Sequence, residues 1–251
     1  CSITNGFGGA GAYSDGKFNI TTEFGGWLTE YLPPSEVLSL IKYVDSINLK
    51  HGATSALTNP DTPKVKEIEK KALGAGLKLL RAQVRHLGTE LNLEILKDIF
   101  QFLTGKIDMI FETAVADIIT EEAEGQLRVK GVRTSQGEEY YAPKVVVVPG
   151  RDGSEWFQAI LKKYNLEMSS NQVDVGVRVE TLDTIMEDIN TNLYEGKFLY
   201  RTSVGTTVRS FCSNPSGHVV IENHTGVMLA NGHAYRDKNL GSNNTNFALL
   251  V

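Results

Sequence analysis

The segment KVVVVPG, at residues 144–150, constrains the fold more than any other part of the sequence. Four consecutive valines without polar alternation are expected of a parallel strand that is covered on both faces. A short glycine-containing turn and the helical pattern EWFQAILKKY follow at once. The sequence therefore predicts a buried strand, a turn and a helix in an α/β sheet.

The first half of the chain has a helical period. Residues 34–106 predict three helices, of which the first lies over residues 34–52. The second is expected from Pro63 to about Val84, and the third opens at Thr89 as its N-cap. These helices follow a glycine-rich block that shows no clear period.

The remainder of the chain is rich in strands. From residue 108 the pattern predicts a meander with turns at Gly125 and Gly137, which leads into the valine strand. Residues 173–251 predict a mostly antiparallel sheet with one short helix near residues 182–190.

These patterns predict an α/β chain with α+β character in two domains. The first, residues 1–165, joins the glycine-rich block, the helical segment and the meander. The second, residues 166–251, holds the mostly antiparallel sheet.

Composition narrows the function classes. A net charge of -5 argues against nucleic acid or an anionic membrane as the partner, which favours a small molecule. Since no apolar run is long enough to span a membrane and no secretory signal pattern is present, we expect a cytoplasmic protein. Cys1 and Cys212 are too few for a metal cluster, so no metal site is expected. The oligomeric state stays open.

The ends of the sequence suggest an internal fragment. The first residue is Cys1 rather than methionine, and the final FALLV has the pattern of a buried strand.

The loop GFGGAGAYSDGK is the first candidate site. Glycines permit close approach of backbone N–H groups to a phosphate or a planar ring, and Ser14 and Lys17 add a hydroxyl and a cation. The spacing matches neither G-x-G-x-x-G after a strand nor the P-loop. A structural glycine loop is an equal alternative.

The turn after the valines is the second candidate. Ligands bind at the carboxyl ends of strands in open α/β sheets, so Gly150 and Arg151 are expected to neighbour a cofactor. An ordinary turn with Arg151 on the surface is the alternative.

Other residues are weaker candidates. Arg178 and Arg209 lie on strands whose shared face would hold a carboxylate, although surface ion pairing is the commoner arrangement. His86 is either a proton donor or a hydrogen-bonding residue, and Cys212 has the pattern of a core cysteine.

Several segments, in this order, resemble a poorly characterised family of bacterial FAD-dependent dehydrogenases among the glutathione-reductase-like flavoproteins. They are GFGGAGAYSDGKFN, RHLGTE, GVRTSQGEEYYAPKVVVVPGRDGSEWF, VDVGVRVE and TVRSFCSNPSGHVVIEN. Members of that family begin with a βαβ unit and end with a Gly-Asp motif, and both are missing from this sequence. The family's second cysteine after Cys212 is also missing, which puts thiol chemistry in doubt.

The resemblance implies which residues meet FAD. Along the pyrophosphate and isoalloxazine it places Gly8, Gly9, Ala10, Gly11, Ser14, Asp15 and Lys17. It places the backbone of Val115 at the adenine and Gly150 and Arg151 at the cofactor turn. Lys17 or Arg178 would stabilise negative charge at the flavin or at a substrate carboxylate.

The implied activity is hydride transfer between FAD and an organic substrate, with NAD(P)H as a candidate electron donor. Two alternatives stay open: a flavin-dependent reductase of a lipid-like substrate, and a non-catalytic fragment that binds a small molecule. A tRNA-modifying flavoprotein is disfavoured by the acidic charge.

Overall fold

The structure is a computed structural model that describes residues 6–224, 226–235 and 237–251, so Cys1 lies outside it. Its contacts divide into two compact units. One comprises Cys1–Gly11 with Phe100–Gln172, and the other comprises Ala12–Ile99 with Val173–Val251. This division by contact is distinct from the expected domains at residues 1–165 and 166–251, which stay a prediction.

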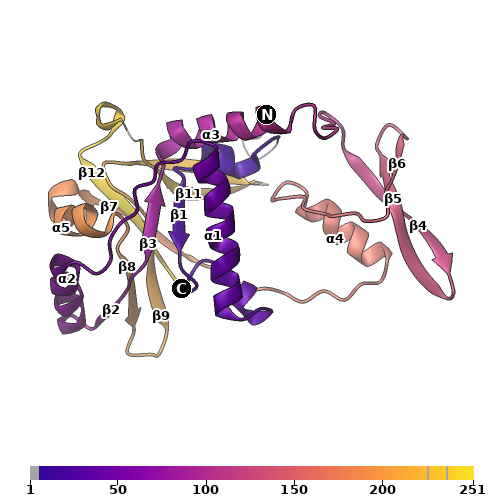
Figure 1. Ribbon diagram of the computed structural model, residues 1–251. Helices are drawn as coiled ribbons and strands as arrows, with labels where there is room; N and C mark the ends of the chain where they lie inside the picture. Colours follow the sequence, from indigo (N-terminus) through magenta and orange to yellow (C-terminus); the bar gives the residue numbers. More distant parts are fainter. Residues whose placement is uncertain (1–5, 225, 236) are drawn as a thin grey trace. The chain divides into compact units, whose positions relative to one another are not determined.

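The unit that contains Phe100–Gln172 holds the expected meander (Figure 1). Its antiparallel strands, in spatial order, are β4 (Val115–Ala123), β5 (Gln126–Thr134) and β6 (Glu139–Tyr141). The expected helix follows as α4 (Ser154–Lys163). It is attached to β4 because Trp156 Nε1 donates to the Ala116 carbonyl at 3.0 Å and the Tyr164 hydroxyl donates to the Ile118 carbonyl at 2.6 Å.

The predicted valine strand is wrong for the described chain. Residues 144–148 form no strand, and Val146 and Val148 are each 82% exposed. A strand needs a neighbour to satisfy its backbone N–H and C=O groups and to cover its side chains. Among the described residues no parallel strand takes that position, so the apolar pattern alone does not produce burial.

Among the described residues of the other unit, five strands form an antiparallel sheet (Figure 1). In spatial order they are β2 (Leu77–Leu80), β8 (Lys197–Arg201), β9 (Thr207–Asn214), β12 (Asn244–Leu250) and β7 (Gly176–Leu182). Helices α2 (Pro63–Gly74) and α5 (Asp183–Leu193) pack together beside this sheet. Their shared core consists of Val65, Ile68, Leu79 and Leu193. The expected antiparallel sheet and the short helix are both confirmed.

Two further strand pairs lie in the same unit. They are β1 (Lys17–Ile20) with β3 (Gln83–His86), and β10 (His218–His224) with β11 (Val227–His233). The remaining helices are α1 (Pro34–Lys50) and α3 (Gly88–Leu103), with short 3-10 turns η1 (Gly9–Tyr13), η2 (Leu28–Glu30) and η3 (Lys238–Leu240). The first helix agrees with the sequence expectation, whereas β1 was not expected.

The second expected helix is too long. It ends at Gly74, and residues 77–86 form β2 and β3 instead. Gly76 has φ +75°, a conformation that terminates a helix readily. Pairing with β8 and β1 then holds the following residues as strands, which overrides their helical spacing. Thr89 is not the N-cap of α3, because that helix begins at Gly88.

The described chain is therefore a mixed α and β structure with mostly antiparallel sheets, which confirms the α+β character. None of the helices in the described ranges has the length and apolar character that a membrane crossing requires.

A buried ion pair fixes α1 against β3. Arg85 Nε and Nη2 donate to the Asp45 carboxylate at 2.7 and 2.8 Å, and both residues are buried. Arg85 also donates to the carbonyls of Thr54 and Ala56, so the segment after α1 joins the same contact. Fork-shaped pairing of this kind is specific in geometry and leaves few polar atoms unsatisfied.

Replacing Asp45 with alanine should leave a buried guanidinium without a counter-charge. We expect the free energy of unfolding, measured by urea denaturation, to fall by about 3 kcal/mol. The control is Lys71→Ala, which breaks an exposed pair with Glu67 in α2 and should leave the midpoint unchanged. Equal midpoints for both variants would contradict the structural role of Asp45.

Candidate functional site around Lys17

The predicted site residues are divided between the two units. Gly8, Gly9, Ala10, Gly11, Val115, Gly150 and Arg151 belong to the unit that contains the meander. Ser14, Asp15, Lys17 and Arg178 belong to the unit that contains the five-stranded sheet. The second group is brought together in space, as the contacts below show.

The glycines of the loop have the conformations that favour glycine. Gly6, Gly8 and Gly9 have φ of +86°, +85° and +51°, and η1 follows. Gly11 differs in that its φ is not left-handed. As at Gly6, a Cβ built on it would meet no atom of the described residues within 4 Å, so there is space for a side chain at this position.

In the meander unit, the other predicted cofactor residues have ordinary structural settings. Val115 is the first residue of β4 and pairs with Thr134. Gly150 has φ +64°, and Arg151 lies in the turn before α4, where its carbonyl accepts from Ser154 N at 3.3 Å. Their roles toward FAD stay a prediction.

Residues 14–16 are pinned to the start of α3. The backbone carbonyls of Asp15 and Gly16 accept from Gly88 N and Leu87 N at 3.0 and 3.1 Å. Asn92 Nδ2 donates to the Ser14 carbonyl at 3.3 Å. Gly16 has φ +64°, and a Cβ there would lie 2.9 Å from Leu87 Cβ. The SDGK segment is therefore a fixed part of the fold.

Lys17, the first residue of β1, is buried at the centre of the site. Its Nζ lies 3.1 Å from Asp15 Oδ2, donates to the Ser213 carbonyl at 2.6 Å and lies 3.9 Å from Cys212 Sγ. Burial by itself lowers the pKa of Lys17, but the charge of Asp15 leads a set of interactions that together raise it. The ammonium group therefore keeps its proton, and it connects β1 to β9.

Four residues that the sequence analysis did not place together complete this centre, namely Phe24, Glu195, Lys197 and Cys212. Glu195 Oε1 accepts from Cys212 N at 3.0 Å and lies 3.7 Å from Lys197 Nζ. Burial lowers the pKa of Lys197, whose ammonium lies 4.2 Å from the centre of the Phe24 ring. This unit therefore buries two lysines with opposite pKa shifts.

His86 lies beside Tyr194, and each ring orients the other. The Tyr194 hydroxyl and His86 Nε2 are 2.6 Å apart, and their ring centroids are 4.0 Å apart. Burial raises the pKa of Tyr194, so its hydroxyl stays protonated and shares a hydrogen bond with the imidazole. His86 is therefore a hydrogen-bonding residue, and whether it also moves a proton stays a prediction.

The backbone is strained at this centre. Tyr194 and Cys212 have φ of +57° and +48°, which non-glycine residues seldom adopt. Among the described residues, Ser213 Oγ, Asn214 Oδ1 and Asn246 Nδ2 are buried without a hydrogen-bond partner. Strained backbone and unsatisfied polar atoms both cluster at functional sites. These two signals arise from tertiary structure, so sequence reasoning had no access to them.

Arg178 is held within the same polar centre. Its Nε donates to Asn246 Oδ1 at 2.9 Å and its Nη2 donates to the Cys212 carbonyl at 2.8 Å. Arg209 pairs with Asp174 instead. The two guanidinium groups thus have protein partners of their own, and their use toward a substrate carboxylate stays a prediction.

No protein-family model matches the chain, and a search of curated proteins finds no significant match. The evidence for the candidate site therefore comes from its own residues and their contacts. In the described ranges, no group of three or more His, Cys, Asp or Glu residues is placed to hold a metal ion.

Gly16→Ala should destabilise the unit through strain and a clash. Gly25 is the matched control, because it has φ +94° but a Cβ there would meet nothing within 4 Å. We expect thermal unfolding to show a loss of about 1 kcal/mol for Gly25→Ala and about 1–3 kcal/mol more for Gly16→Ala. Equal losses would show that the contact with Leu87 does not limit this position.

Lys17→Met should leave the Asp15 carboxylate buried without a counter-charge. We expect a loss of about 3 kcal/mol in the free energy of unfolding at neutral pH. The raised pKa of Lys17 makes its contribution fully present below the unfolded value of about 10.4, and lost as pH rises through the higher folded value. Urea titrations of both proteins should therefore converge only above about pH 10.4.

The matched control for this pH dependence is Lys66→Met, which removes an exposed lysine of α2. It should follow the wild-type protein at every pH. A Lys17→Met protein with wild-type stability at neutral pH would contradict the assigned role of Lys17.

Proposed function

We propose that this chain is part of an FAD-dependent oxidoreductase that transfers hydride between the flavin and an organic substrate. The observation that carries the proposal is how the SDGK segment, residues 14–17, is held in the fold. This segment belongs to the loop that resembles the flavoprotein family. Backbone hydrogen bonds hold it against α3, and it ends in the ion pair of Asp15 and Lys17, whose side chains are buried. The fold therefore fixes the conformation of this segment.

Gly11 supports contact between the loop backbone and a flat or phosphate-bearing group. A side chain would fit the fold at this position, since a Cβ meets no atom within 4 Å and φ is not left-handed. The space thus suits a cofactor that approaches the backbone closely. In the proposal Gly8, Gly9 and Ala10 share this contact, and Ser14 offers its hydroxyl.

The exposed side chains of Val146 and Val148 support the same proposal. An apolar segment with both valines 82% exposed is suited to contact with another apolar surface. Gly150 and Arg151 directly follow this segment, and in the proposal they approach the cofactor. Val115 would present its backbone to the adenine.

Bound FAD would supply the redox chemistry. The chain would bind the cofactor and provide the electrostatic environment around it. Lys17 keeps its charge because Asp15 and the Ser213 carbonyl hold its ammonium in place. Of the two predicted cations, Arg178 has the uncharged partners Asn246 and the Cys212 carbonyl, so its positive field would favour negative charge that develops on a neighbouring group. NAD(P)H is the proposed electron donor, and the cytoplasm the proposed location.

Flavin retention by the natural protein that contains this chain tests the proposal. We expect the purified protein to show the visible absorption bands of bound FAD. Gly11→Val should reduce FAD occupancy by at least about tenfold, because the side chain occupies the space of the cofactor. The matched control is Gly74→Val, where a Cβ also meets nothing within 4 Å. Absence of flavin from the wild-type protein, after FAD is added, would refute the proposal.

A further inference from the structure

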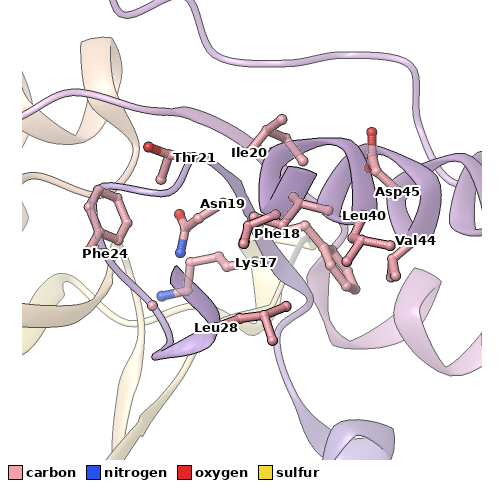
Figure 2. A pocket seen from close by; sticks show the side chains of 13 residues that line it. Lys17, Phe18, Asn19, Ile20, Thr21, Phe24, Leu28, Leu40, Val44 and Asp45 are labelled. Atoms are coloured by element: carbon pink, nitrogen blue, oxygen red, sulfur yellow. The ribbon is translucent and has the colours of Figure 1, made fainter. Parts of the chain in front are cut away.

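A pocket of about 400 Å³ lies in the unit that contains the five-stranded sheet (Figure 2). Its walls come from β1, the segment through η2, and α1. Most of its lining residues are apolar, among them Phe18, Phe24, Leu28, Leu40 and Val44. Leu28, Leu40 and Val44 are 46, 43 and 51% exposed, so the described residues of this unit leave the apolar lining partly exposed. Its volume and lining are typical of small-molecule sites.

The two charged residues that line the pocket are both neutralised within the protein. Lys17 pairs with Asp15 and donates to the Ser213 carbonyl. Asp45 holds the buried Arg85 through two hydrogen bonds. A charged ligand group would therefore lose its water without gaining a counter-charge, which is costly. This excludes phosphates and carboxylates and favours an uncharged ligand.

Asn19 supplies a polar contact in these walls. It lies on β1 between Phe18 and Ile20 and lines the pocket (Figure 2). Its side-chain amide has no hydrogen-bond partner among the described residues, so a donor and an acceptor are both available. A ligand amide or carbonyl group would complement this side chain.

We propose that this pocket binds an uncharged, largely apolar small molecule that carries an amide or a similar carbonyl group. The apolar walls bind its hydrocarbon part, and Asn19 orients its polar group. The proposal needs no flavin, so it stands or falls separately from the proposed oxidoreductase activity.

Competition on the purified 251-residue chain tests the ligand class. Nile red, an uncharged apolar dye, reports occupancy by its fluorescence, and decanamide and decanoate compete for the site at neutral pH. We expect decanamide to displace the dye at least about tenfold more effectively than decanoate, because the carboxylate finds no counter-charge. Failure of decanamide to displace the dye, or equal competition by the two, overturns the proposal.

Variants test the location. Leu40→Trp should fill the pocket and weaken decanamide binding at least about tenfold, whereas Tyr43→Trp, on an exposed position of the same helix, should not. Leu28→Trp fills the pocket from η2 if Leu40→Trp does not fold. Asn19→Leu should weaken decanamide about two- to tenfold and leave Nile red unchanged. Equal decanamide binding by the folded filling variant and by Tyr43→Trp places the ligand elsewhere and overturns the proposal.

Discussion

The buried ammonium of Lys17 is the contact on which the arrangement of the site depends. Lys17 begins β1, and its charge is compensated by Asp15 in the preceding turn and by the Ser213 carbonyl of β9. A buried cation demands such partners, since an unpaired one would cost several kcal/mol. The segment at residues 14–17 is for this reason held against the five-stranded sheet, and Cys212, Glu195 and Arg178 are drawn into one polar centre.

This arrangement is accompanied by backbone strain and by buried polar atoms that lack hydrogen bonds. Tyr194 and Cys212 are left-handed without being glycine, and three buried polar atoms nearby have no hydrogen bond among the described residues. Each of these features opposes folding by about 1–3 kcal/mol. They persist because the sheet and the core of α2 and α5 hold the surrounding residues in place.

Local chemistry explains which elements were predictable. The meander, α4 and the antiparallel strands after residue 176 have strong alternation or clear turn residues such as Gly125 and Gly137, so their structure follows from nearby sequence. Residues 77–86 have helical spacing, but pairing with β8 and β1 makes them strands. The strand predicted at residues 144–148 is absent for the opposite reason. Its local apolar pattern is strong, but no partner strand pairs with it among the described residues. Candidate residues were predictable where they share a motif, as Ser14, Asp15 and Lys17 do.

By itself the sequence determined the residue types of the site, the mixed α and β character, the meander and the antiparallel strands after residue 176. These depend on side-chain period, turn chemistry and charge, which are properties of short stretches of chain. Only the tertiary structure decided that Lys17 pairs with Asp15 while lying against β9, that His86 meets Tyr194, and that Asn19 lines a largely apolar pocket. Apart from the pair of Asp15 and Lys17, these contacts join residues far apart in sequence, and a buried charge or amide acquires its properties from the partners that folding places around it.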